Sequence, residues 1–341
     1  MNTLSGQAAA EEASRDGDAF LRQAAEYRPE LLAHCYRMLG SVQDAEDLVQ
    51  ETYLRAWRGH GGFEGRSSLR FWLYRIATSA CLTALRHSSR RFVPAGLGTA
   101  SDDATAPLNP TGAEVPWVQP MPDPAPDPAA VVAERGSVRL ALVVALQQLP
   151  PKQRAVLILR DVLAWHAAEV AELLDTSPAA VNSALQRARA QLRQAAATED
   201  DVTDSLDERG RALVDRFAKA FEDADVDALA RLLSDDVRLE MPPDPQWFAG
   251  RAVVLRFLAE RVFPIAGDQR LLGLTVNDGQ PTLATYWRAA DGRFHPHALQ
   301  VLTLRGHRVA GVLAFREAHF PAYGLPATLG PDTPPAPSWL R

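Results

Sequence analysis

The sequence contains only two cysteines, Cys35 and Cys81, and neither belongs to a CxxC pair or has a histidine at ligand spacing. This scarcity argues against a zinc centre or a disulfide scaffold, so both thiols are expected to be buried and reduced. No run reaches the roughly 18–20 apolar residues of a transmembrane helix. The first residues also lack the basic and apolar regions of a signal peptide, so we expect a cytoplasmic protein without membrane contact.

Basic residues are fewer than acidic ones, 36 against 42, but the two are unevenly distributed along the chain. Residues 20–91 and 135–197 each contain more basic than acidic residues. Residues 92–134 contain six acidic residues, no basic residue and nine prolines. Two modestly basic modules that suit a polyanionic partner are therefore separated by an acidic segment.

Apolar residues recur at helical spacing through 18–91 and again through 135–197. Residues 92–134 favour an extended polyproline conformation that cannot build a core, so we predict a linker there. Residues 1–17 are predicted to be a disordered tail. Within 135–197 we expect four helices, with the tight turn "DTS" before the last one, which is typical of a helix-turn-helix.

The segment "TSPAAVNSALQRARAQLRQ", residues 176–194, predicts the last of these helices, capped by Ser177. Its inner stripe is apolar, and its outer face is made of amides, hydroxyls and guanidinium groups without any acidic residue. Such groups read base edges and bind phosphates. The polar positions are Asn182, Ser183, Gln186, Arg187, Arg189 and Arg193.

Two blocks of the sequence resemble one family of bacterial proteins. "LPPKQRAVLILRDVLAWHAAEVAELLDTSPAAVNSALQRARAQL" resembles the fourth conserved region of sigma-70-type RNA polymerase sigma factors, in particular the extracytoplasmic-function (ECF) group. "LGSVQDAEDLVQETYLRAWR" with "FEGRSSLRFWLYRIATSACLTALR" resembles the second region. The resemblance implies two all-α modules, a region 2 helical bundle and a region 4 helix-turn-helix.

The resemblance also implies contacts with core RNA polymerase, through its beta-prime clamp and beta flap, and with promoter DNA. The positions that match the clamp-binding block are Asp44, Glu46, Asp47, Leu48, Gln50 and Glu51. Those that match the block reading the −10 element are Phe63, Arg66, Ser67, Trp72, Arg75, Ser79 and Arg86. The recognition helix, with the six polar residues named above, would enter the major groove at the −35 element.

Three positions depart from the family pattern. Ser79 stands where many members have Asn, which alters the expected −10 contacts. Asp175 replaces a common Gly in the turn, but Asp tolerates left-handed backbone well. His166 lies in a divergent run and is expected to start a helix rather than bind a metal. In this family the linker threads through polymerase, where acidic residues would mimic RNA; a passive tether is equally compatible with its sequence.

Residues 205–325 predict an α+β domain that resembles the SnoaL-like branch of the NTF2-like fold, a cone with a curved antiparallel sheet. Helices are expected at 207–233 and 250–262, and strands at 236–241, 269–276, 282–289, 297–305 and 307–316. The candidate polar residues of a ligand cavity are Asp236, Tyr286, His295 and His297, and the candidate apolar lining residues are Trp247 and Trp287. Residues 326–341 are predicted to be a loosely held, Pro-rich tail.

These patterns predict a sigma factor that directs core polymerase to promoters, with the C-terminal domain as a built-in regulator. Two ways of regulation stay open for that domain, contact with the sigma regions and the sensing of a small ligand. No acid/base spacing indicates an enzyme, and no cofactor or metal is expected. Two alternatives remain open at this point. One is a ligand-responsive helix-turn-helix regulator that needs no polymerase, and the other is a SnoaL-like enzyme with accessory DNA-binding helices.

Overall fold

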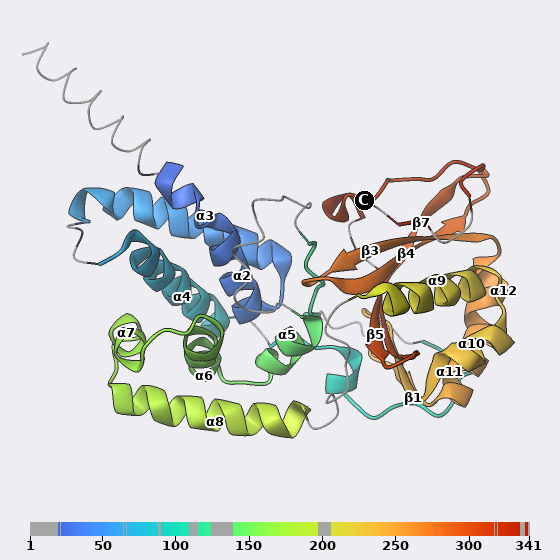
Figure 1. The fold of residues 1–341 in the computed structure, drawn as a ribbon, viewed down its shortest axis with the longest axis horizontal. Coiled ribbons are helices and arrows are strands. Elements are labelled where there is room, and N and C mark those ends of the chain that lie inside the picture. Colours follow the sequence, from blue (N-terminus) through green and yellow to red (C-terminus); the bar gives the residue numbers. More distant parts are fainter. Residues whose placement is uncertain are drawn as a thin grey trace, which may run out of the picture. The chain divides into compact units, whose positions relative to one another are not determined.

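The protein is described by a computed structural model. It covers residues 20, 22–63, 65, 67–87, 90–108, 115–123, 139–196, 206–316, 318, 320–334 and 338–339. The chain divides into two compact units: Met1–Arg90 with Ala129–Ala195 form the first, and Arg91–Pro128 with Ala196–Arg341 form the second. Figure 1 shows a first unit of helices and a second unit in which helices pack on a sheet. The tail predicted at 1–17 lies outside the described residues.

The first three long helices of unit 1 have clear sequence signals at their ends. They are α2 (Arg28–Leu39), α3 (Val42–Gly59) and α4 (Leu69–His87). Gly40 ends α2 in the left-handed conformation, with a φ of 71°, where glycine carries no side-chain strain. Ser41 then caps α3 by accepting a hydrogen bond from the Asp44 amide, and the Ser68 hydroxyl caps α4. Of the two serines that precede α4, Ser68 is therefore the one that caps the helix.

The second half of unit 1 confirms the four helical segments predicted after residue 135. The elements are α5 (Leu140–Gln147), α6 (Pro151–Leu157) with a π-helical turn η4 (Ile158–Val162), α7 (Ala167–Leu173) and α8 (Pro178–Ala196). His166 is the N-cap of α7, and its amide donates to the Glu169 carboxylate. The turn between α7 and α8 places Asp175 at a φ of 51°, so the left-handed backbone expected there is present.

Unit 2 is an α+β domain, as predicted. Its helices are α9 (Glu208–Glu222), α10 (Val226–Leu232) and α11 (Arg251–Phe257), which continues through η5 (Leu258–Val262) and α12 (Phe263–Ala266). Its strands are β1 (Leu233–Glu240), β2 (Trp247–Ala249), β3 (Gln269–Val276), β4 (Gln280–Arg288), β5 (Phe294–Arg305), β6 (Arg308–Phe315) and β7 (Ser338–Trp339). The five predicted strands correspond to β1, β3, β4, β5 and β6; β2 and β7 were not predicted.

The strands form one sheet in the order β2-β1-β6-β5-β4-β3-β7. The sheet is mixed rather than wholly antiparallel, because β1 runs parallel to β6 and β7 runs parallel to β3. The apolar inner side of α9 packs against the strands, with Phe217 and Phe221 in the common core (Figure 1). No helix among the described residues is long and apolar enough to cross a membrane.

Two Pro-rich segments differ from the sequence-based expectation, because both pack on unit 2. In the predicted linker, Ala104 is fully buried in the core of unit 2 and Leu108 packs against that core. In the predicted loose tail, Leu329 is buried, and Trp339 lies over Gly273 of β3. Proline-rich sequence excludes regular ladders of its own, but it does not prevent single apolar side chains from docking on another domain.

Candidate nucleic-acid interface and cavity

The face of α8 that is predicted to bind DNA is exposed to solvent, and the opposite face of the helix is buried. Ser177 caps the helix by accepting from the Ala180 amide at 3.2 Å. Val181, Leu185 and Ala188 are buried, as the apolar stripe predicted. All six polar residues predicted for the −35 contact are exposed: Asn182, Ser183, Gln186, Arg187, Arg189 and Arg193.

One arginine on this face already has an acidic partner. Arg189 donates from Nε and Nη2 to both carboxylate oxygens of Asp161, at 2.8 and 2.7 Å. The pKa of Arg189 is raised, first by this hydrogen bond and then by the charge of Asp161. Asp161 lies in η4, 28 residues earlier in the chain, so inspection of the helix alone did not reveal it. The outer face of α8 contains no acidic residue of the helix itself, but the folded chain places Asp161 of η4 beside it.

The predicted clamp-binding residues lie on α3 with different degrees of exposure. Asp47 and Gln50 are exposed, whereas Asp44 and Leu48 are half-buried. Glu46 approaches Arg28 at 3.7 Å, and Glu51 pairs with Arg55 at 2.7 Å on the same helix. The carboxylates of Glu46 and Glu51 therefore have basic neighbours.

Sequence inspection did not single out Leu54, whose side chain is 51% exposed beside Asp47 and Gln50 on the outer stripe of α3. It falls outside the buried stripe of Ala45, Val49, Thr52 and Ala56, and this misfit in periodicity was the available signal. Single exposed leucines are common on protein surfaces, so Leu54 does not by itself mark a partner site.

The predicted −10 residues separate into an exposed stripe and a packed aromatic pair. Arg75, Ser79 and Arg86 are exposed on one side of α4. Trp72 is half-buried and stacks on Phe63, with ring centroids 4.9 Å apart, so it acts as packing for the loop before α4. Ser67 is half-buried, and Arg66 lies outside the described residues.

A buried guanidinium in unit 1 was not singled out from the sequence. Arg154 of α6 is 2% exposed and donates to the carbonyls of Met38, Gln147 and Leu149, and to the Gln147 side chain. Burial lowers its pKa to about 10, so it remains charged at neutral pH. Through Met38, this contact joins the predicted region 4 to the predicted region 2.

The linker makes a series of polar contacts with unit 2. The Ala95 amide donates to the Glu240 carboxylate at 2.8 Å, and the Trp247 indole donates to the Gly98 carbonyl. Arg261 donates to the carbonyls of Thr105 and Ala106.

Further along the linker, Asp123 accepts from the amides of Asp278 and Gly279 in the β3–β4 turn. The described parts of the linker, 92–108 and 115–123, therefore belong to unit 2 rather than forming a free tether.

A cavity with about 590 Å³ of unfilled space, part of it open to solvent, lies between the helices and the sheet of unit 2. Trp287 and His297 line it, as predicted, but Asp236, His295, Trp247 and Tyr286 do not. Trp247 is held by the linker instead, and Tyr286 points its hydroxyl to the Pro326 carbonyl at 2.9 Å. Successive residues of a strand face opposite sides, so Tyr286 cannot share the cavity side with Trp287.

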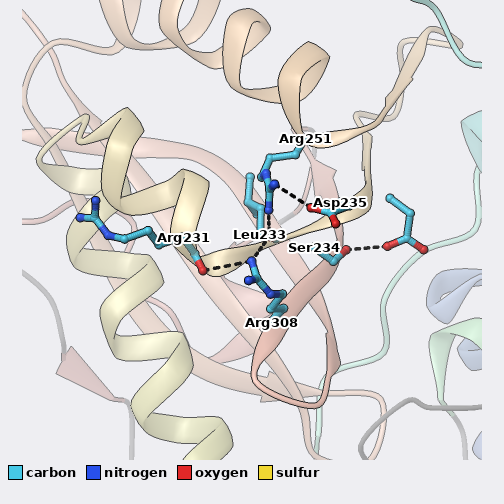
Figure 2. A network of polar contacts seen from close by, with 7 residues as sticks. Arg231, Leu233, Ser234, Asp235, Arg251 and Arg308 are labelled. Carbon is cyan, nitrogen blue, oxygen red and sulfur yellow. Dashed lines mark hydrogen bonds and ion pairs between the residues drawn. The ribbon is translucent and has the colours of Figure 1, made fainter.

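The cavity wall has little net charge, and hydrogen bonds hold one of its residues in place. Leu233 of the wall has its carbonyl bound by Arg251 and Arg308, as Figure 2 shows at the junction of α10 and β1. Burial, and secondly the charge of Arg316, lowers the pKa of His297 to about 4, so its imidazole is neutral at pH 7. Arg316 itself is paired with the buried carboxylate of Asp244.

Comparison with known proteins places these features in a family. Family models for sigma-70 region 2, sigma-70 region 4 and a SnoaL-like domain match residues 24–91, 139–192 and 214–318. These matches, with the helix-turn-helix at α7–α8, define a sigma-70-type sigma factor carrying an additional domain. Because the chain is 48% identical over 95% of its length to an extracytoplasmic-function (ECF) RNA polymerase sigma factor, it belongs to that family.

Nearly the whole chain is similar to the ECF RNA polymerase sigma factor SigG of Mycobacterium tuberculosis. The two are 48% identical over 333 residues, which cover 95% of this chain and 88% of that protein. SigJ of the same organism is 32% identical over 217 residues, covering 62% of this chain and 61% of SigJ. The crystal structure of SigJ matches with a TM-score of 0.56 and 27% identity, over 89% of this chain and 99% of that one.

Proposed function

We propose that the protein is a cytoplasmic initiation factor that binds core RNA polymerase and directs it to promoters, with its C-terminal unit as a built-in regulator that is not an enzyme. The observation that carries the promoter-binding role is the outer face of α8, where six exposed polar residues stand opposite a buried stripe. Amides and guanidinium groups at the exposed face of a helix-turn-helix suit base edges and phosphates in the major groove.

The exposed stripe of α4 supports contact with the −10 element. Arg75 and Arg86 have no acidic partner among the described residues, so their charges are available to a DNA strand. On α3, Asp47, Gln50 and Leu54 form an adjoining polar and apolar set that suits the polymerase clamp. We assign these two helices to melting and to core binding, respectively.

Regulation is proposed to act through the linker. A segment that has to thread through polymerase cannot at the same time bury Ala104 in the core of unit 2. The contacts of Ala95, Thr105 and Asp123 with unit 2 therefore oppose the extended linker that the polymerase complex requires. Release of the linker becomes a regulated step before initiation.

The promoter-binding role is tested by run-off transcription with purified core polymerase and genomic promoter fragments. Arg187→Ala is expected to reduce promoter binding about tenfold, since one base-contacting arginine contributes roughly 1–3 kcal/mol. Arg216→Ala removes an exposed arginine from α9 and serves as the matched control. Equal loss in both variants, or no co-purification with core polymerase, would contradict this role.

The regulatory role is tested in the same assay by loosening the linker. Arg261→Ala combined with Asp123→Ala removes four hydrogen bonds between the linker and unit 2. We expect transcription to increase by at least about thirtyfold, because four net hydrogen bonds at roughly 0.5–1.5 kcal/mol each hold the linker by about 2 kcal/mol or more. Arg288→Ala, which breaks an exposed ion pair with Asp268, is the control. Unchanged output from the double variant would refute linker control and leave the promoter-binding role intact.

A further inference from the structure

The cavity of unit 2 contains two buried polar atoms that have no partner among the described residues. One is the Nε1 of Trp287 on β4, and the other is the Oε1 of Gln300 on β5. Both residues line the cavity, and Gln300 is only 4% exposed. An unsatisfied buried donor or acceptor is costly and rare in folded proteins, so two in one cavity require a reason.

Gln300 is held in position by its other amide atom. Its Nε2 donates to the Thr285 hydroxyl at 2.7 Å, and Thr285 is itself 1% exposed. The amide plane is therefore fixed while Oε1 remains without a donor. Thr285 and Trp287 face the same side of β4, two residues apart, so the three polar side chains belong to one wall.

A β-bulge places a flat ring beside them. The β4–β5 register shifts between Thr285 and Tyr286, whose partners are Ala298 and Pro296, and His297 is the additional residue. Its ring stacks on Trp287 with an interplanar angle of 12°. Bulges commonly re-aim side chains at functional sites. Here the bulge fixes the indole so that its N–H has one orientation.

The remaining surface determines the charge and polarity of an occupant. The opposite wall is apolar, with Phe217 and Phe221 from α9 and Leu258 from η5. The charges of Arg316 and Asp244 neutralise one another in an ion pair, and no other charged residue of the described chain lines the cavity. A charged ligand would have to be desolvated without compensation, so the site favours a neutral one.

We propose that this cavity binds a small, neutral, predominantly apolar molecule bearing one hydroxyl group, which accepts from Trp287 Nε1 and donates to Gln300 Oε1. A hydroxyl is the simplest group that satisfies both atoms at once, because it both donates and accepts. A carbonyl would leave Gln300 unsatisfied, and an ammonium would leave Trp287 unsatisfied. The site is independent of promoter recognition and of linker control, because its evidence is confined to the cavity wall.

The test is calorimetric titration of the full-length chain with 2-naphthol, with naphthalene as the probe that lacks the hydroxyl. Saturable binding of 2-naphthol is expected, at least about tenfold tighter than binding of naphthalene. Trp287→Phe and Gln300→Leu should each weaken 2-naphthol binding about tenfold while removing most of the preference over naphthalene. Thermal unfolding of each variant verifies that it is folded.

Trp247→Phe is the matched control, because it removes an indole N–H that is bound to the Gly98 carbonyl outside the cavity. Its affinity for 2-naphthol should equal that of the unmodified chain. Absence of saturable binding, or equal affinity for 2-naphthol and naphthalene in the unmodified chain, would overturn the proposal even if a variant fails to fold. Unchanged affinity in folded Trp287→Phe and Gln300→Leu would overturn it as well.

Discussion

The two units place their polar groups in opposite ways. In unit 1, α8 directs Asn182, Gln186 and Arg187 outward from a buried apolar stripe. In unit 2, Thr285 and Gln300 are directed inward, onto a cavity between helices and sheet. Outward polar groups suit a large partner with a regular surface, such as a DNA groove, whereas inward groups suit a small molecule or the chain itself.

The same contrast appears in how each unit treats its neighbouring segments. Unit 2 binds both flanking Pro-rich stretches, through Ala104 on one side and Trp339 on the other. Within unit 1, Arg189 is the outer-face arginine of α8 that has an acidic partner, Asp161. The Pro-rich segments of the chain thus cover part of unit 2, while most of the polar residues on the outer face of α8 in unit 1 remain exposed to a partner.

The largest predicted effect on stability concerns Arg154. Unit 1 directs the arginines of α8 outward, but it buries this one. Arg154→Leu leaves the carbonyls of Met38, Gln147 and Leu149 buried without their donor. We expect the free energy of unfolding to fall by roughly 3 kcal/mol, because unsatisfied buried polar groups are costly. Urea denaturation followed by circular dichroism measures this change.

Arg58→Leu makes the same chemical change at an exposed position of α3 and is the control. It should alter stability by less than about 0.5 kcal/mol, as is usual for surface substitutions. If Arg154→Leu were as mild as the control, the buried guanidinium would not be holding α2 and α6 together. A buried and an exposed arginine would then contribute equally to the free energy of unfolding.

Most of unit 1 was predictable because local signals agree with the fold. Ser41, Ser68 and Ser177 cap helices where the apolar periodicity begins, and the exposed residues of α8 are the predicted ones. The ion pair of Arg189 with Asp161 was not predictable, because it depends on how the π-helical turn η4 approaches α8. Arg154 likewise looks like any surface arginine until α2 is placed beside it.

Unit 2 was less predictable for the same physical reason. Five strands have the composition and periodicity of strands, but β2 and β7 are only three and two residues long and have no periodicity to detect. Trp287 and His297 were correctly placed at the cavity, whereas Trp247 and Tyr286 were not. The side of a sheet that an aromatic residue faces depends on register and bulges, and the bulge at His297 has no clear sequence signature.

A smaller effect is predicted where unit 2 binds the C-terminal segment. A Cβ at Gly273 would lie 2.7 Å from the Trp339 ring, so Gly273→Val forces β7 away from β3. The expected cost is about 1–3 kcal/mol in the free energy of unfolding, typical of overpacking. Limited proteolysis should also cut the last residues faster. Gly330→Val is the control, since nothing lies within 4 Å of a Cβ there; equal behaviour of the two variants would show that the segment is not docked.

The smallest effect, on promoter affinity, is expected at Asp161. It tests whether the ion pair with Asp161 keeps Arg189 from contacting DNA. Asp161→Asn keeps the size of the side chain but removes the charge that holds Arg189. If Arg189 changes partner from Asp161 to a phosphate on promoter binding, the variant should bind promoter DNA slightly more tightly, by less than about threefold, because exposed ion pairs are weak. The polymerase complex is titrated with a promoter fragment over a series of KCl concentrations.

The salt dependence distinguishes the two outcomes for Arg189. If Arg189 of the unmodified chain already reaches a phosphate on binding, the slope of log K against log[salt] stays unchanged in the variant. If the guanidinium reaches the backbone only after Asp161 is neutralised, it adds one phosphate contact and steepens the slope by about 0.9. Asp223→Asn, which breaks a comparable exposed pair with Lys219 in unit 2, should change neither quantity. Weaker binding by Asp161→Asn would instead mean that the carboxylate orients Arg189 toward the DNA, so that the pair is part of the recognition surface rather than a competitor for it.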